Sequence, residues 1–302
     1  MEILKDISII FISIFFESLP FLLLGALISS VIETYVSNET MAKIIPKNKV
    51  LGSIVGVFLG FFLPACDCAV IPVSKRLLKK KVPINVAVSF MLASPIINPV
   101  VLLSTYYAFY DKNPEIFWYR LLFGILISLI IGIIIGIIYG KKEVIKNDLD
   151  DNCDCHIEHD HHHHHKHTFK KDFLSICKHT ANDMFEVVKF LMFGALIASL
   201  IQVLLPRNVL LVFNNNQVLS VITLMVFAYL ISLCSTSDSF VGKTLLSSFP
   251  KGSIMAYLLL GPMIDIKNTI VLLGNYKKSF VVTLISLIFI IVFAFSMVVV
   301  AI

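Results

Sequence analysis

Long apolar runs alternate with short charged loops along most of the chain. A helix needs about 20 apolar residues to cross a bilayer, and eight runs approach or exceed that length. The runs are continuously apolar, unlike the alternating strands of a membrane barrel. The pattern therefore predicts an all-α polytopic membrane protein. The expected spanning segments lie at about 7–33, 50–73, 84–109, 117–139, 183–205, 218–241, 253–274 and 280–301.

Composition and charge support a membrane protein. Of 302 residues, 57% are hydrophobic and 15% are charged, whereas soluble domains carry about a quarter charged residues. The net charge of +5 comes mostly from Lys and Arg between the apolar runs, where orientation signals are expected, and it does not indicate nucleic-acid binding. With eight crossings, their distribution places the N-terminus and the 141–182 loop in the cytoplasm, and the protein in the inner (cytoplasmic) membrane.

The two halves of the chain resemble each other at an offset of about 168 residues. We therefore predict a first repeat at 1–140, a polar linker at 141–180 and a second repeat at 181–302. Four true crossings per repeat would orient both repeats alike, whereas one re-entrant segment per repeat would invert them. The matched residues include Glu17 and Glu186, Gly25-Ala26-Leu27-Ile28 and Gly194-Ala195-Leu196-Ile197, Cys66 and Cys234, Lys75 and Lys243, and Pro95 and Pro262.

Polar clusters that contain cysteine interrupt one apolar segment in each half. Cys66-Asp67-Cys68 lies between Pro64 and Pro72, and the matching segment reads Cys234-Ser235-Thr236-Ser237-Asp238. Proline disturbs a helix, and an ionised Asp in lipid is costly, so Asp67 and Asp238 should face a cavity or a partner. The alternative is that both clusters lie at the membrane surface and cap a helix.

A second pair of breaks follows in each half. Ser94-Pro95-Ile96-Ile97-Asn98-Pro99 matches Gly261-Pro262-Met263-Ile264-Asp265, and Lys267 and Asn268 follow. We expect broken or re-entrant helices at all four motifs, because broken helices expose backbone groups that bind ions or polar substrates. A simple kink with locally satisfied polar groups is the alternative.

Glu17 and Glu186 lie within matched apolar segments. A carboxyl group there is suited to carrying a proton during transport, since desolvation favours its neutral form. A hydrogen bond between the repeats explains the pair equally well.

The polar linker is rich in metal-binding side chains. Eight of the nine His residues fall between positions 153 and 167, beside two Cys. Imidazole and thiolate suit zinc and other transition metals, but the spacing matches no fixed tetrahedral site. We predict exchangeable metal binding here, with a plain solvated linker as the alternative. The candidate ligands are Cys153, Cys155, His156, His159, His161, His163, His165 and His167.

The motifs together resemble the predicted permease family that includes the bacterial organoarsenical efflux permeases. The resemblance rests on residues 66–72, 93–99, 234–241 and 261–268, and it covers nearly all of the chain outside 141–180. It implies an eight-segment inner-membrane permease, arsenical export in the characterised branch, and a second permease subunit for some members. The His-rich linker is not part of the family pattern.

These observations predict a permease, not an enzyme, that works by alternating access between its two repeats in the lipid bilayer. The substrate would be a small thiophilic solute such as a trivalent organoarsenical. A divalent metal transporter with a His-rich collector loop, and a thiol–disulfide electron relay, are the alternatives. No cofactor is required, and a second subunit or a homo-oligomer is the expected partner. The predicted substrate-binding residues are Cys66, Asp67, Cys68, Asn98, Cys234, Ser235, Asp238, Asp265 and Asn268, and the predicted proton-coupling residues are Glu17, Glu186 and Asp238.

Overall fold

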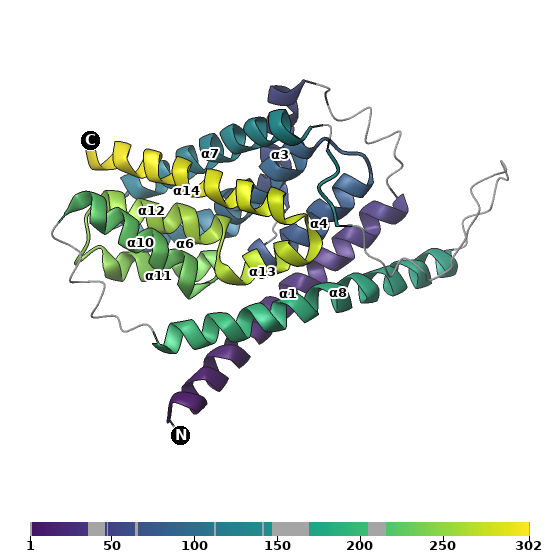
Figure 1. Ribbon diagram of the computed structural model, residues 1–302, viewed down its shortest axis with the longest axis horizontal. Helices are drawn as coiled ribbons and strands as arrows, with labels where there is room; N and C mark the ends of the chain where they lie inside the picture. The colour runs from purple at the N-terminus through teal and green to yellow at the C-terminus, as the bar shows by residue number, and fades with distance from the viewer. Residues whose placement is uncertain are drawn as a thin grey trace.

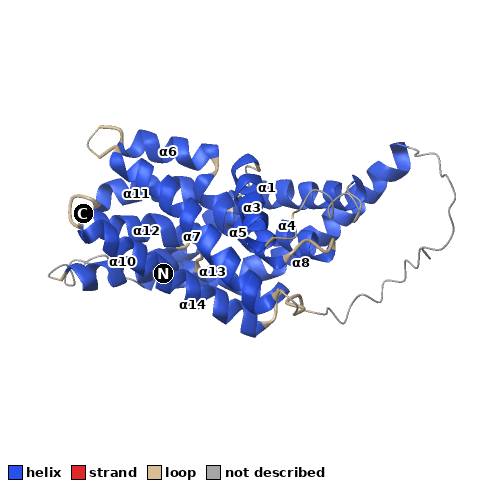
Figure 2. Ribbon diagram, turned by 90° about the horizontal axis from the view of Figure 1, so that it is seen from above, coloured by secondary structure: helices blue, strands red, loops and turns tan. Residues whose placement is uncertain are grey.

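The computed structural model describes residues 2–35, 46, 48–63, 66–111, 113–140, 142–146, 169–204 and 216–301. Every regular element in these ranges is a helix, which confirms the all-α prediction for this part of the chain (Figures 1 and 2). The helices are α1 (Glu2–Tyr35), α3 (Lys49–Phe62), α4 (Asp67–Lys79), α5 (Ile84–Ile97), α6 (Pro99–Phe109), α7 (Glu115–Tyr139), α8 (Phe169–Leu204), α10 (Gln217–Ile231), α11 (Ser235–Leu245), α12 (Lys251–Met263), α13 (Ile266–Asn275) and α14 (Lys278–Ala301).

Six stretches of the described chain are long and apolar enough to cross a membrane. They are α1, the α5–α6 pair, α7, α8, the α12–α13 pair and α14, and they coincide with six of the eight predicted segments. The apolar helices α3 and α10 are shorter. The other two predicted segments, 50–73 and 218–241, correspond to the pairs α3–α4 and α10–α11.

Both of these pairs are helical hairpins that return to the end of the molecule from which they start. At the start of α5, Asn85 Nδ2 donates a hydrogen bond of 2.8 Å to the carbonyl of Lys49 at the start of α3. Since α4 leads directly into α5, the two ends of the first hairpin lie together. The second hairpin repeats this arrangement, because Ser253 at the start of α12 donates to Ser220 near the start of α10 at 2.9 Å. The prediction of eight crossings is therefore not confirmed, because neither hairpin runs from one end of the molecule to the other.

The two hairpins enter from opposite ends of the molecule. Helix α7 has 25 residues and is about 37 Å long. Its first residue, Glu115, pairs with Lys251 at the start of α12, whereas Gly136 near its other end packs against Asn85 at the start of α5. We call the end that holds Asn85 the loop end and the end that holds Lys251 the terminal end.

Contacts with these two ends show in which direction each remaining helix runs. Tyr139 Oη lies 3.1 Å from the Ser279 carbonyl, so α14 starts at the loop end, and Gly252 packs against Val300, so α14 finishes at the terminal end. Helix α8 runs inward from the loop end, since its Phe190 packs against Gly274 at the end of α13 and Gly194 packs against Lys267 near the start of α13. The second half of α1 lies beside this part of α8, since Thr180 Oγ1 donates to Ser30 Oγ at 2.9 Å.

The start of α1 and the end of α7, where the 141–182 loop begins, lie at opposite ends of the molecule, because three of the six candidate spanning stretches separate them. Three crossings between them would place them on opposite sides of a membrane, unlike the expectation that both are cytoplasmic. The difference comes from the first hairpin: if it does not cross, three crossings precede the 141–182 loop instead of the four expected from eight simple segments.

Each half of the described chain contains the same elements in the same order. A long helix is followed by a hairpin, then by a broken crossing and an unbroken crossing. With three candidate spanning stretches each, the halves run in opposite directions through the molecule. This order agrees with the repeats expected at 1–140 and 181–302, whose common origin stays a prediction.

All four predicted helix breaks are observed. Helix α5 ends before Asn98, which precedes Pro99, and a residue before proline disfavours the helical conformation. Helix α12 carries Pro262 in its last turn and ends before Asp265. The second hairpin turns through Ser232, which has a left-handed backbone with φ of 51°.

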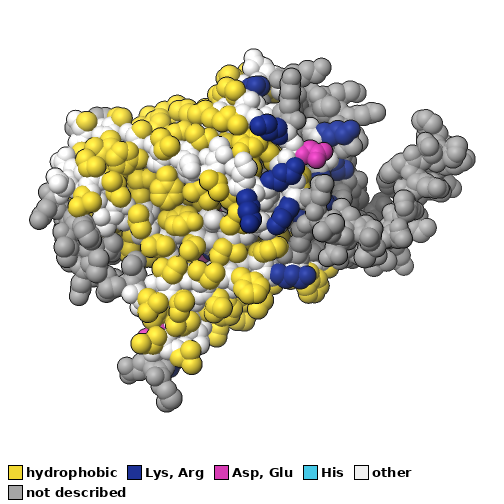
Figure 3. All heavy atoms as spheres, viewed as in Figure 1, with side chains coloured by type: hydrophobic (Ala, Val, Ile, Leu, Met, Phe, Trp, Pro, Cys, Tyr) yellow, Lys and Arg dark blue, Asp and Glu magenta, His cyan; other side chains and the backbone are white. Residues whose placement is uncertain are grey.

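The broken crossings form the centre of the molecule, and the unbroken helices cover them. Every residue of α5 is buried, and α12 is buried from Gly252 to Met263. Large apolar side chains of α1, α7, α8 and α14 face outward, such as Phe16, Trp118, Phe193 and Ile290. Figure 3 shows this apolar surface, with Lys and Arg gathered at one end. Such a surface suits a multi-pass membrane protein.

Candidate functional site

Cysteine begins the second helix of each hairpin. Cys66 is the N-cap residue of α4 and Cys234 is the N-cap residue of α11, and both have extended backbones without a side-chain capping bond. The two thiols thus occupy equivalent places at the two hairpin tips. Because the hairpins enter from opposite ends, their tips meet in the interior of the molecule.

The three described cysteines line one small cavity. Cys66, Cys68 and Cys234 contribute to its wall, together with Glu17 and Ser18 of α1. The cavity measures about 10 Å³, which is enough for roughly one water molecule. All three thiols are free. The thiols predicted to act together are therefore brought to one place, in a closed conformation.

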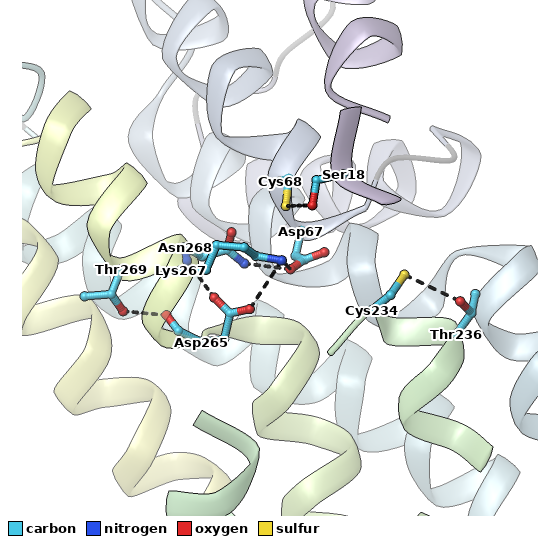
Figure 4. Close-up of polar contacts among 9 residues, drawn as sticks. All are labelled: Ser18, Asp67, Cys68, Cys234, Thr236, Asp265, Lys267, Asn268 and Thr269. Carbon is cyan, nitrogen blue, oxygen red and sulfur yellow. Dashed lines mark hydrogen bonds and ion pairs between the residues drawn. The ribbon is translucent and has the colours of Figure 1, made fainter. Parts of the chain in front are cut away.

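Charged and amide side chains form a buried network beside the thiols (Figure 4). Asn268 Nδ2 donates to Asp67 Oδ2 at 2.8 Å. Lys267 Nζ lies 3.6 Å from Asp67 Oδ2 and 3.7 Å from Asp265 Oδ2. Asp265 also caps α13, by accepting a bond of 2.6 Å from the backbone N–H of Asn268. At most 5% of each of these side chains is exposed.

The network joins the two halves of the chain. Asp67 lies at the tip of the first hairpin, whereas its partners lie at the break between α12 and α13. Two carboxylates and one ammonium leave one net negative charge when all are ionised. A buried charge is costly unless it is paired, so this network favours the arrival of one further positive charge, such as a proton.

A second buried polar cluster lies toward the terminal end. Tyr257 Oη donates to Asp238 Oδ1 at 3.0 Å. Arg120 is fully buried and donates to Ser239 Oγ and Thr105 Oγ1, both at 2.7 Å. Arg120 also interacts electrostatically with Asp238. Asp238 and Ser235, predicted as substrate ligands, belong to this cluster and not to the wall of the thiol cavity.

Two further predicted site residues, Asn98 and Glu17, are not at the centre of the thiol cavity. Asn98 caps α6 by accepting a bond of 2.9 Å from the Val100 N–H, and it does not line the thiol cavity. Glu17 lines the cavity but is otherwise exposed. The side chain of Glu186 lies outside the described residues, as do Cys153, Cys155, His156, His159, His161, His163, His165 and His167.

Sequence reasoning missed the role of Arg120 and one of the two partners of Lys267. Arg120 reads as a basic residue beside a loop, yet it is buried in α7. The available signal was a lone Arg among Trp118, Tyr119 and Leu121, at the start of an apolar run. Lys267 was recognisable only as a neighbour of Asp265, because its second partner, Asp67, is 200 positions away in the sequence.

The thiols and Asp67 have the composition of a soft-metal site. One donor atom each from Cys66, Asp67 and Cys68 lies within 4.8 Å of the others. Thiolates bind zinc, cadmium and trivalent arsenic well, and a carboxylate favours cations. The Lys267 ammonium occupies one side of this group. The site therefore combines thiols that attract soft electrophiles with an ammonium that offsets part of the negative charge by which Asp67 attracts cations.

Comparison with known proteins identifies the family. The ArsP_1 model, described as "Predicted permease", matches residues 3–301. The chain belongs to this predicted permease family.

Two relatives extend this result. The permease is 40% identical over 294 residues to the "UPF0718 protein YcgR" of Bacillus subtilis, covering 97% of each chain. It is 34% identical over 272 residues to a "Putative two-component membrane permease complex subunit" of Streptococcus mutans, covering 90% of this chain and 87% of that protein. No solved structure matches the chain. The family and its relatives support a membrane transporter rather than an enzyme.

Proposed function

We propose that this permease moves a small thiophilic solute, such as a trivalent organoarsenical, by alternating access between its two halves. One observation carries the proposal: Cys66, Cys68 and Cys234, from the tips of two hairpins, line the same interior cavity. Trivalent arsenic prefers sulfur ligands, and free thiols near one another can bind it together.

Binding requires no redox change. An organoarsenical with two hydroxyl groups on arsenic reacts with two thiols, for example those of Cys66 and Cys68. Two As–S bonds form and two As–O bonds break, and each hydroxyl leaves as water with one thiol proton. The product is a neutral dithioarsenite, so arsenic stays trivalent. The reaction reverses when water or outside thiols reach the site, which permits release on the other side.

Matched contacts close the two ends of the pathway. At the loop end, α4 contacts the end of α13, where Ser74 Oγ lies 2.8 Å from Tyr276 Oη and Lys75 donates to Asn275 at 3.1 Å. At the terminal end, α11 contacts α6 through Ser239 and Thr105, 3.0 Å apart. A cavity of about 10 Å³ does not hold an organoarsenical, so loading requires one of these contacts to open.

The distribution of charge supports a cytoplasmic loop end. Lys79, Lys80, Lys81, Lys142, Lys146, Lys277 and Lys278 gather there, whereas Lys5, Lys243 and Lys251 lie toward the terminal end. Basic residues favour the cytoplasmic side of the inner membrane. The His-rich loop would then be cytoplasmic and both termini would lie outside.

Proton coupling is part of the proposal. The net negative charge of Asp67, Lys267 and Asp265 supports uptake of a proton, and Glu17 lies at the edge of the same cavity. Asp238 and Glu186 keep their proposed roles as further proton carriers. The name of the streptococcal relative supports a second permease subunit, with a homo-oligomer as the other possible assembly.

Replacement of each cavity cysteine tests the proposal. Everted membrane vesicles with Cys66→Ser, Cys68→Ser or Cys234→Ser should lose accumulation of a trivalent organoarsenical at unchanged protein level. Cys177→Ser, which changes a cysteine at the start of α8, should retain it. Wild-type accumulation in all three cavity variants would contradict thiol coordination.

The second candidate is divalent metal transport, which the grouping of Cys66, Asp67 and Cys68 favours. Cysteines and histidines of residues 153–167 would then collect zinc or another transition metal. Deleting 153–167 should lower cellular metal accumulation, and an unchanged metal content would count against this candidate. A thiol–disulfide relay is a third possibility: trapping of thiol states should then detect a disulfide that forms and breaks with turnover.

A further inference from the structure

A large cavity lies at the loop end, away from the thiols. It measures about 620 Å³ and its lining includes Lys79, Lys81, Lys142 and Lys146, with Glu143 as the one acidic residue. Helices α4, α5 and α7 meet there with the segment 142–146. Four ammonium groups around one cavity form an environment for an anion with several oxygen atoms.

One wall of this cavity is held in place by backbone pairing. Ile145 forms a β-bridge with Tyr276, Lys146 N–H donates to the Asn275 carbonyl at 3.1 Å, and Lys277 N–H donates to the Val144 carbonyl at 2.9 Å. Lys142 Nζ lies 5.6 Å from the centre of the Tyr139 ring. The segment that carries two of the lysines is therefore an ordered wall fixed to the end of α13.

The opposite wall holds a lysine in an unusual backbone conformation. After α4, Lys81 has φ of 62°, and Val82 N–H donates to the Leu77 carbonyl at 3.1 Å. This is the helix end at which glycine is usual, since other residues are disfavoured there by about 1–2 kcal/mol. The chain thus places a basic side chain, rather than glycine, at the rim of the cavity.

The position of the cavity indicates where its ligand comes from. It lies where the apolar α7 ends and the lysines begin, which is the depth of lipid headgroups. Its lining also includes apolar side chains such as Val82 and Ile84. Basic pockets between membrane helices suit the phosphate groups of anionic lipids.

We propose that this cavity binds the phosphate group of an anionic phospholipid from the surrounding leaflet. The lipid would join the end of α4 to the segment 142–146, which is itself bonded to the end of α13. These are the elements whose contacts through Ser74 and Tyr276 close the loop end. Bound lipid therefore favours the conformation that is closed at the loop end.

Lipid titration of the full-length protein tests this inference. The protein in zwitterionic detergent is titrated with phosphatidylglycerol or with phosphatidylcholine of the same acyl chains, and retained lipid is measured by native mass spectrometry. We expect preferential retention of phosphatidylglycerol. The double variant Lys79→Gln/Lys146→Gln should weaken it about 30-fold, because each lysine near an anionic surface contributes about 1 kcal/mol.

The double variant Lys277→Gln/Lys278→Gln is the matched control. It removes the same charge from the same end, but neither residue lines the cavity. Equal retention of both lipids, or equal losses in the two double variants, would overturn the proposal. Displacement of phosphatidylglycerol by an equimolar concentration of inorganic phosphate would overturn the lipid assignment in favour of a soluble ligand. This test does not measure arsenical transport, so the lipid proposal can fail while the proposed function holds, and the reverse.

Discussion

Replacing Lys267 by methionine removes the one cation between Asp67 and Asp265. The ammonium lies 3.6 and 3.7 Å from the two carboxylates, and all three groups are buried. At an effective dielectric constant of about 20, each contact is a Coulomb attraction of about 4–5 kcal/mol. Desolvation offsets part of this, and removing one member of a buried pair costs about 3–5 kcal/mol net.

The same substitution should change what the thiol site binds. In the wild type, Lys267 repels a divalent metal ion from Cys66, Asp67 and Cys68. Two unit charges about 4 Å apart repel by about 4 kcal/mol at the same dielectric constant, and tenfold in affinity corresponds to about 1.4 kcal/mol. Lys267→Met should therefore bind cadmium at least about 100-fold more tightly than the wild type.

The assay is a cadmium titration of purified protein, followed through the ultraviolet absorption of the cadmium–thiolate bond. Lys267→Arg keeps the charge and should resemble the wild type, and Lys189→Met removes an exposed lysine of α8 as a control. The double variant Lys267→Met/Asp265→Asn removes both charges and should regain part of the lost stability. Equal cadmium affinity in wild type and Lys267→Met would refute the view that Lys267 excludes cations.

Three further predictions concern packing, the second cluster and topology. Gly56→Ala should destabilise the first hairpin by about 1–3 kcal/mol, because the added Cβ of residue 56 would lie 2.4 Å from the Val86 carbonyl oxygen. The loss is measured as a lower aggregation temperature in membranes, and an unchanged temperature would contradict the close packing of α3 on α5. Arg120→Met should cost about 1–3 kcal/mol in thermal unfolding, because the buried hydroxyls of Ser239 and Thr105 lose the guanidinium that donates to them. Arg120→Met/Asp238→Asn should recover part of this loss if the electrostatic interaction with Asp238 contributes; equal losses in both variants would exclude that contribution. Lys49→Cys and Lys79→Cys, at the two ends of the first hairpin and in a background without other accessible cysteines, should react with impermeant maleimide from the same face; labelling from opposite faces would contradict the six-crossing arrangement.

Local chemistry in the sequence was sufficient to predict the four helix breaks. Pro99 fixes the break at Asn98, and Asp265 caps the helix that follows it. The convergence of Cys66 and Cys234 followed from their matching places in the two halves. These features depend on neighbouring residues or on internal similarity, both of which one sequence contains.

Hydropathy alone could not give the number of crossings. A hairpin of two short apolar helices and one spanning helix have the same length and the same apolar content. The deciding contacts, Asn85 with the Lys49 carbonyl and Ser253 with Ser220, are made by small polar side chains with partners 33 or more positions away. The buried partners of Arg120 and Lys267 are similarly distant, so no local pattern reveals them.

Thiol protection tests the central account most directly. The purified protein is incubated with phenylarsine oxide and then alkylated with N-ethylmaleimide, and the modified cysteines are quantified by peptide mass spectrometry. Because one arsenical forms two As–S bonds, one equivalent should protect two of the three thiols of Cys66, Cys68 and Cys234 in each protein molecule, and alkylation of Cys177 should stay at the rate seen without arsenical. Alkylation of the three cavity cysteines at the rate seen without arsenical would contradict a shared thiol site.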